Sequence, residues 1–342
     1  MTSDCTLNMT YTTYQLPGVR MSVSAEPIVV QRALEWLFQV CPQTSEPSDL
    51  HLEAIGIRTE HVITAIPDWV RANLPANNSD PFTIQGPAGE LATVGRFYGL
   101  LFCAWINLEQ TMARLVCEMG DEEQPQSTTL SIISLVLFPV LRDVFLRKQG
   151  LLLHSAAVKC PNGIGIQFVA ESCGGKTTTC LSLVRLGAKF VSDDLVVVSL
   201  SGNKAIAYGL PKPLNLREPT LEYFEELRKA ASTANPLTGK SSVIPQSVYG
   251  SACLEASCSI NVLYFLNLSI TGPSLRRIGV GESLEKLLSS HAFSVMQPTG
   301  GDSIVGLCDL LSMVPSYLLD TGKNPEYLGK WILENCHEHA QT

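Results

Sequence analysis

Residues 170–177, Ala-Glu-Ser-Cys-Gly-Gly-Lys-Thr, contain the residue types that bind phosphate groups. In the phosphate-binding loop G-x-x-x-x-G-K-[ST], glycines let backbone N–H groups approach phosphate oxygens, the Lys meets the outer phosphates and the hydroxyl binds Mg²⁺. Gly175, Lys176 and Thr177 satisfy this pattern, whereas Ala170 occupies the first Gly position. The segment predicts phosphate binding, and the competing interpretation is a turn followed by a surface Lys.

Two adjacent carboxylates, Asp193 and Asp194, interrupt an apolar segment that begins near Lys189 and continues to Leu200. Carboxylates there can hold Mg²⁺ or accept a proton from an attacking hydroxyl. The alternative is an acidic turn between two strands. Because adjacent buried charges are costly unless a cation or hydrogen bonds offset them, we favour a functional role.

A single imidazole, His154, lies in the apolar run 151–158, which is a strand candidate. Such a His is usually a hydrogen-bonded core residue. If its strand shares a sheet with the loop, however, the imidazole can position or tune one of the aspartates.

The surrounding pattern predicts the elements that position these groups. Strands are expected at 151–158 and 164–169, joined by the turn Pro161-Asn162-Gly163, followed by a helix over 177–186 that Gly187 stops and a strand over 189–200. A strand before the loop and a helix after it are the context that a phosphate-binding loop requires.

Taken together, these pieces resemble the C-terminal domain of the HPr kinase/phosphorylase family and its HPr-kinase-like relatives. That family shows a His-bearing strand, a loop of the type G-[DE]-S-G-x-G-K-[ST], a helix, a Gly and a strand ending in Asp-Asp. This chain has the same order: His154, residues 170–177, Gly187 and Val191-Ser-Asp-Asp194. The resemblance covers residues 150–200 well and extends thinly to about residue 335.

The resemblance implies an α/β fold of the HPr-kinase/phosphoenolpyruvate-carboxykinase P-loop type, with ATP and Mg²⁺ as cofactors. It implies Asp193 as the base, assisted by His154, and Thr177 and Asp194 as metal ligands, although the sequence leaves the roles of the two aspartates interchangeable. It assigns nucleotide binding to a contiguous set of residues: Glu171, Ser172, Cys173, Gly174, Gly175, Lys176, Thr177 and Thr178.

Departures from the family pattern bear on activity and acceptor. Ala170 and Cys173 replace two loop glycines, and a β-carbon at a position with positive φ costs about 1–2 kcal/mol. The segment 209–217 is Pro-rich and basic and lacks the HPr-specific signature, so HPr is not the expected acceptor. Three cations are candidate substrate or phosphate clamps, with solvated surface charge as the alternative: Lys212, Arg217 and Lys240.

Composition limits the remaining function classes. The 342 residues are 45% apolar and 16% charged, which describes a folded protein, and the net charge of −8 argues against nucleic-acid or anionic-membrane partners. The 11 scattered Cys predict reduced thiols in a cytoplasmic protein. The apolar stretches Phe97–Ile106 and Leu130–Leu141 are too short to span a bilayer, which needs about 20 residues, so we expect two buried helices.

The sequence therefore predicts an α+β N-terminal region of unknown role over 1–148 and an HPr-kinase-like P-loop domain over 149–342. The predicted activity is Mg-ATP-dependent transfer of phosphate to a hydroxyl of a small molecule, peptide or modified natural product. The alternatives are a nucleotide-binding regulator or pseudokinase without transfer and a scaffold that retains only the fold. The resemblance also permits a homo-oligomer.

Overall fold

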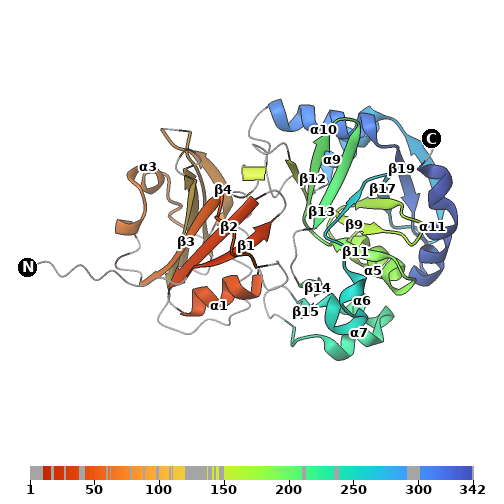
Figure 1. Cartoon of the computed structure of the whole chain (residues 1–342), viewed down its shortest axis with the longest axis horizontal. Helices are drawn as coiled ribbons and strands as arrows, with labels where there is room; N and C mark the ends of the chain where they lie inside the picture. The colour runs from red at the N-terminus through yellow and green to blue at the C-terminus, as the bar shows by residue number, and fades with distance from the viewer. Residues whose placement is uncertain are drawn as a thin grey trace, which may run out of the picture. The chain divides into compact units, whose positions relative to one another are not determined.

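The computed structural model divides the chain into two compact units, Met1–Val144 and Phe145–Thr342 (Figure 1). The structure describes residues 11–16, 19–26, 28–37, 43–58, 61, 63–77, 79–87, 89–97, 100–107, 109, 111–119, 137, 141, 144–145, 150–209, 213–234, 239–290 and 301–340. The predicted boundary near residue 148 falls outside the described residues. The roles predicted for the two regions stay predictions.

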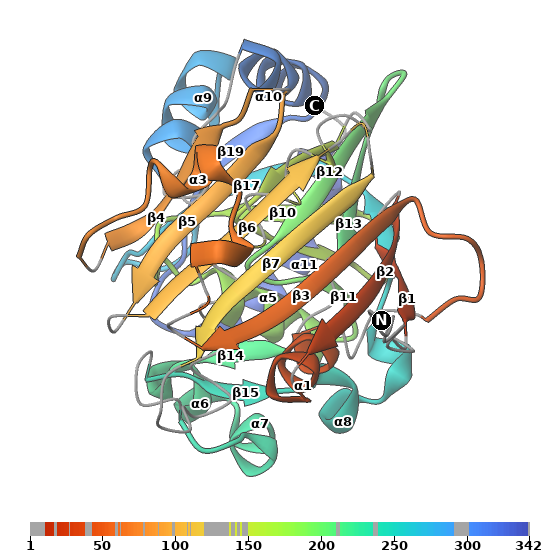
Figure 2. The same cartoon turned by 90° about the vertical axis from the view of Figure 1, so that its left-hand side faces the viewer.

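The first unit is built on a seven-stranded sheet with the order β1-β2-β3-β7-β6-β5-β4. Its strands are β1 Thr12–Leu16, β2 Val19–Glu26, β3 Leu50–Arg58, β4 Ser79–Gln85, β5 Leu91–Phe97, β6 Leu100–Asn107 and β7 Met112–Met119. β2, β3 and β7 run parallel, and helix α1 (Ile28–Leu37) is in the crossover that the first parallel pair requires. A short 3₁₀ turn, Ile63–Ala65, and helix α3, Asp68–Arg71, follow β3. Figure 2 shows this sheet facing the viewer.

The buried helix expected at Phe97–Ile106 is wrong, because Phe97 is the last residue of β5 and residues 100–106 belong to β6. Every residue of β6 from Leu101 to Ile106 is buried. A short, fully apolar run has no periodicity that distinguishes a buried strand from a buried helix, so the sequence pattern could not decide. Most of the other expected helix, Leu130–Leu141, lies outside the described residues.

The second unit contains two larger sheets (Figure 1). The six-stranded sheet has the order β11-β9-β10-β17-β19-β18, and the four-stranded sheet has the order β16-β13-β12-β8. Their strands are β8 Gly150–Leu153, β9 Ala156–Lys159, β10 Gly165–Val169, β11 Lys189–Ser192, β12 Val196–Ser201, β13 Lys204–Gly209, β16 Ser257–Ser259, β17 Val262–Asn267, β18 Ser274–Ile278 and β19 Ser316–Asp320. A two-stranded ribbon pairs β14 (Leu214–Leu216) with β15 (Ser241–Val243). The predicted α/β class is confirmed.

Helices cover these sheets on both sides. α5 (Lys176–Arg185) and α11 (Pro325–His339) share one apolar cluster with the six-stranded sheet, and α9 (Val280–Ser289) and α10 (Gly301–Met313) share a second cluster with the four-stranded sheet. The shorter helices are α6 Glu218–Tyr223, α7 Glu225–Ala230, α8 Pro245–Tyr249 and the 3₁₀ turn Ser251–Cys253. Among the described residues, no helix is both long enough and apolar enough to cross a membrane.

Two segments that the sequence presents as single strands each break and change sheet. The run 151–158 divides at His154-Ser155 into β8 and β9, and the run 189–200 divides at Asp193-Asp194 into β11 and β12. β8 pairs with β12 in the four-stranded sheet, while β9 pairs with β11 in the six-stranded sheet. The two breaks therefore lie side by side, and they bring His154 next to the aspartates.

Candidate functional site

The predicted phosphate-binding loop joins β10 to α5 in the way its pattern requires. β10 is fully buried between β9 and β17, and α5 begins at Lys176. Gly175 caps the helix with φ 88°, a left-handed conformation that glycine adopts without steric cost. The unpaired N–H groups and the positive dipole end of α5 consequently lie at the loop, where they favour an anion.

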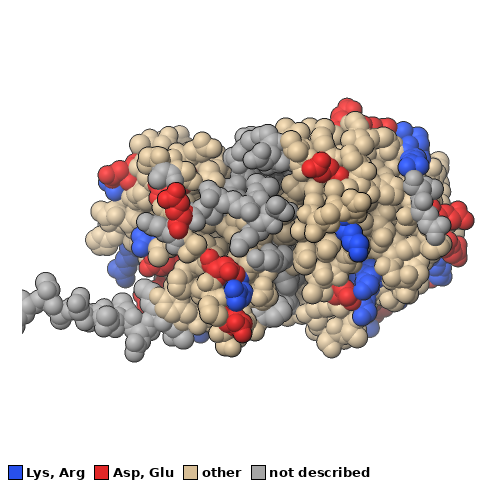
Figure 3. All heavy atoms as spheres, turned by 45° about the horizontal axis from the view of Figure 1, so that its top comes forward, with Lys and Arg blue, Asp and Glu red and all other residues tan. Residues whose placement is uncertain are grey.

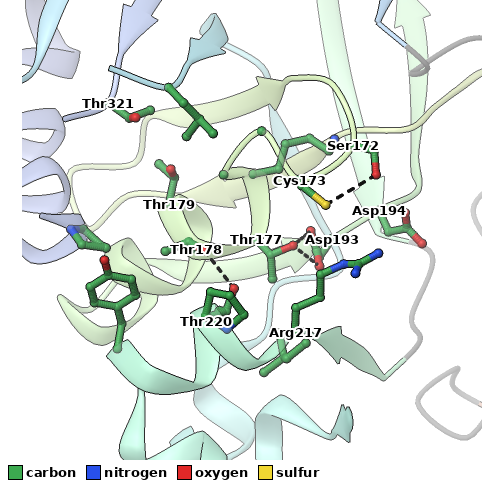
Figure 4. A pocket seen from close by; sticks show the side chains of 18 of the residues that line it. Ser172, Cys173, Thr177, Thr178, Thr179, Asp193, Asp194, Arg217, Thr220 and Thr321 are labelled. Atoms are coloured by element: carbon green, nitrogen blue, oxygen red, sulfur yellow. Dashed lines mark hydrogen bonds between the residues drawn. The ribbon is translucent and has the colours of Figure 1, made fainter. Parts of the chain in front are cut away.

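A cavity of about 600 Å³ opens at this helix end (Figure 4). Its lining brings together His154, Ser172, Cys173, Gly174, Gly175, Lys176, Thr177, Thr178, Thr179, Asp193, Asp194, Asn215, Leu216, Arg217, Pro219, Thr220, Tyr223, Lys240, Leu268, Thr321, Gly322, Lys323, Pro325 and Leu328. All but one of the predicted site residues that the structure describes are in this set. The exception is Glu171, whose backbone carbonyl accepts hydrogen bonds from the loop.

The two residues that replace loop glycines behave differently. Ala170 is buried, and φ is not positive there. A Cβ at Gly174 would lie only 2.7 Å from the Ala170 Cβ, so the loop accommodates one β-carbon here by having none at the facing position. Cys173 has φ 63°, so its β-carbon strains the backbone in the left-handed region. Its side chain is exposed.

Replacing Cys173 by Gly should stabilise the second unit by about 1 kcal/mol relative to Cys173→Ala, because only Gly removes the β-carbon from the left-handed position. Urea unfolding of the two variants measures the difference. Cys173→Ala is the matched control, since it removes the thiol and keeps the β-carbon. If Cys173→Gly were no more stable than Cys173→Ala, the β-carbon at this position would not strain the backbone.

Lys176 is buried at the floor of the loop. Its Nζ donates hydrogen bonds to the carbonyl oxygens of Ala170 (2.8 Å) and Glu171 (3.1 Å). Burial lowers the pKa of this ammonium group, and the charges of Asp193 and Asp194 oppose that shift. The charge is thus held where α5 begins and close to two carboxylates.

Thr177 contacts Asp193 through both carboxylate oxygens. The Thr177 hydroxyl lies 3.0 Å from Oδ1 and 2.9 Å from Oδ2 of Asp193, and it donates to this carboxylate. Asp193 is only 7% exposed. The neighbouring Ser192 hydroxyl donates to the Leu195 carbonyl oxygen across the two aspartates and closes the turn that carries them.

His154 contacts the other aspartate. Its Nε2 lies 2.9 Å from Oδ1 of Asp194, whose side chain is 40% exposed. An ionised carboxylate can only accept, so Nε2 carries the proton in this contact. Asp194 has φ 77°, a conformation rare for a residue with a side chain, and such strain concentrates at functional sites.

The predicted cationic clamps have different positions. Arg217 precedes α6 and lines the cavity, and Figure 4 shows its side chain directed toward the part of the cavity with the aspartates. Lys240 also lines the cavity, close enough for its charge to lower the pKa of Lys176 further. Lys212 lies outside the described residues. On the face shown in Figure 3, basic and acidic side chains form small separate groups.

Sequence reasoning missed the far wall of the cavity. Thr220 on α6 contacts Thr178 of α5 through their hydroxyl oxygens, 3.1 Å apart. Leu268 follows β17, the segment 321–324 joins β19 to α11, and Pro325 begins α11. No local motif marks these residues, because tertiary folding alone brings them to the loop.

Part of this chain is similar in sequence to HPr kinase/phosphorylases. No protein-family model matches the chain. Over 87 residues it is 37% identical to the HPr kinase/phosphorylase of Treponema pallidum, equally in a strain of the subspecies pallidum and in the Nichols strain. This match covers 25% of the chain and 26% of the relatives, so the chain spans about a quarter of the length of the curated relatives it matches. The predicted resemblance to this family is confirmed.

The solved structures that are similar to this chain include the Hpr(Ser) kinase/phosphatase from Coxiella burnetii. It has a TM-score of 0.33 and 11% identity, over 56% of this chain and 90% of that chain.

Proposed function

We propose that this protein is a Mg-ATP-dependent phosphotransferase that transfers the γ-phosphoryl group to a hydroxyl of a small molecule or peptide. The cavity at the start of α5 is the reaction site. Phosphoryl transfer demands mainly positioning and neutralisation of charge, so the proposal depends on how the loop, the cations and the two aspartates are arranged.

The contact between Thr177 and Asp193 carries this proposal. In P-loop nucleotide-binding proteins, the hydroxyl that follows the loop Lys and a carboxylate from a neighbouring strand hold Mg²⁺ together. Here the hydroxyl lies about equally far from the two carboxylate oxygens, at the end of the helix where phosphates bind.

The donor set at this position fits magnesium. Mg²⁺ is bound by hard oxygen ligands, typically one or two carboxylates together with substrate phosphates. Among the described residues, no group of three or more His, Cys, Asp or Glu side chains could hold a metal ion by itself. Thr177 and Asp193 would hold an ion that enters with the nucleotide, and this ion would neutralise charge on the phosphate oxygens.

The proton-transfer role is proposed for Asp194. The sequence resemblance assigned this role to Asp193 and a metal-binding role to Asp194, but the contacts favour the opposite division. Asp193 is buried and holds the Thr177 hydroxyl, whereas the side chain of Asp194 is 40% exposed. Asp194 takes the hydroxyl proton as the acceptor oxygen bonds to the γ-phosphorus and ADP leaves. His154 orients the carboxylate through Nε2.

Three cations support binding of a highly charged nucleotide. Lys176 lines the cavity from the loop. Arg217, which follows β14, and Lys240, which precedes β15, line it from the same end of the β14–β15 ribbon. Lys176 is proposed to meet the β- and γ-phosphates, and Arg217 and Lys240 are proposed to neutralise charge that develops during transfer.

A nucleotide-binding protein without transfer activity is the second candidate. The strained Cys173 favours it, because an extra side chain lies in the loop that must enclose the phosphates. A screen of hydroxyl-bearing metabolites and Ser- or Thr-containing peptides, followed by mass spectrometry, separates the two. A product heavier by one phosphoryl group that depends on Mg-ATP supports the phosphotransferase. Saturable ATP binding with neither transfer nor hydrolysis would establish the second candidate instead.

A further inference from the structure

Gln167 is a polar residue buried in the strand that leads into the phosphate-binding loop. It lies in the middle of β10 and is fully buried. Its neighbours in the adjacent strands are Ala157 of β9 and Leu263 of β17, both in the apolar cluster between the two larger sheets. Within the part of the chain that the structure describes, its Oε1 is buried and accepts no hydrogen bond.

An apolar residue would suit this position better for stability. A buried acceptor without a partner carries a desolvation penalty that no packing contact removes. Polar groups that a core retains at such a cost are expected to position something. The residue that accepts a hydrogen bond from the amide nitrogen of Gln167 indicates what is positioned here.

The Gln167 amide donates to Ser155, the residue immediately after His154. The Nε2–Oγ distance is 2.8 Å, and Ser155 is also fully buried. The Ser155 backbone N–H donates to the Leu153 carbonyl oxygen at 3.0 Å, and the Ser155 hydroxyl lies 3.4 Å from the same oxygen. These contacts close a three-residue turn with His154 at its centre.

This turn is the break between β8 and β9 that brings His154 to Asp194. A three-residue turn has bent, weak hydrogen bonds, so its geometry depends on surrounding support. Gln167 of β10 supplies that support. The same strand ends at Val169, and the phosphate-binding loop begins at the next residue, Ala170. One rigid strand thus fixes both the phosphate-binding loop and the turn that carries the imidazole.

We propose that Gln167 is a positioning residue that acts through Ser155 to hold His154 against Asp194. This inference rests on the phosphotransferase function proposed above, because it assigns Gln167 to the proton-transfer step. Gln167 lies in the core behind the turn and is not among the residues that line the cavity, so its substitution should leave nucleotide binding intact.

The test uses Gln167→Met and Ser155→Ala in the full chain, with Gln246→Met as the matched control. Gln246 likewise has a buried Oε1 that accepts no hydrogen bond from the described residues, but it lies in α8 and does not line the cavity. We expect Gln167→Met to be at least as stable as the parent in urea and to bind ATP within twofold of it. Its kcat should fall tenfold or more, and Gln246→Met should keep the parent kcat.

A second readout does not depend on activity. The imidazole ¹⁵N resonances of His154, assigned by their loss in His154→Gln, report which nitrogen carries the proton. We expect both Gln167→Met and Ser155→Ala to shift the Nε2 resonance toward the average of the two tautomers. Parent-like His154 resonances in both folded variants would overturn the inference, even if the parent protein transfers no phosphate. Parent-like kcat in Gln167→Met would overturn it as well.

Discussion

Asp194→Asn is expected to lower kcat for phosphoryl transfer by about 10²- to 10⁴-fold while leaving the affinity for Mg-ATP within a few-fold of the parent. The amide keeps the shape of the carboxylate and still accepts a hydrogen bond from His154 Nε2, but it cannot take the acceptor proton. Asp193→Asn should instead weaken binding of Mg-ATP, because it removes the negative charge that Thr177 contacts.

Single-turnover transfer and isothermal titration calorimetry on both variants separate these roles. Asp309→Asn is the control, since Asp309 lies in α10 and does not line the cavity. If Asp193→Asn lost transfer with normal Mg-ATP binding and Asp194→Asn lost binding, the roles of the two aspartates would be those first expected from the sequence resemblance.

Lys176→Met should raise the Kd for ATP by about 10- to 100-fold, because a hydrogen bond to a charged group contributes roughly 1.5–3 kcal/mol. The aliphatic part of the side chain can still fill the space below the loop. The carbonyl oxygens of Ala170 and Glu171 lose a donor, so far-ultraviolet circular dichroism is needed to show that the variant folds. Lys204→Met, at the exposed first residue of β13, is the matched control and should bind ATP normally.

The lowered pKa of Lys176 adds a pH dependence. Burial favours the neutral amine and lowers the pKa of Lys176 below the ordinary lysine value of 10.5. The affinity of the protein for ATP should therefore fall as the pH rises through this lowered pKa, because the amine then loses its charge. Lys176→Met should lack this decline. Titrations of ATP between pH 7 and pH 10 test the effect, and an identical pH profile in parent and variant would mean that another group causes it.

The local part of the site could be predicted from the sequence. Strand, glycine loop, helix and Gly187 follow one another with short-range signals, and each forms at the expected place. The resemblance also selected His154 and both aspartates as one group. The predictions of the local elements succeed because turn chemistry and periodicity act over few residues.

Three features could not be predicted, each for a physical reason. An apolar run gives no sign that its strand will leave one sheet and join another, so the breaks at His154 and at Asp193-Asp194 were expected to be continuous strand. Which aspartate contacts Thr177 depends on the turn between those sheets. The cavity wall at 321–325 comes from a distant segment that shares no motif with the loop.

Binding of ATP to the parent protein and to Thr177→Val, each with Mg²⁺ and with EDTA, tests the central proposal most directly. The proposal expects the parent to bind ATP at least about tenfold more tightly with Mg²⁺ than with EDTA. A tenfold difference in affinity corresponds to roughly 1.4 kcal/mol, which one hydroxyl–metal contact and its hydrogen bonds can supply. Thr177→Val, which keeps the branched shape and loses the hydroxyl, should bind ATP weakly and with little response to Mg²⁺. Equal ATP affinity in all four measurements, or no ATP binding by the parent, would contradict a magnesium-nucleotide site at Thr177 and Asp193.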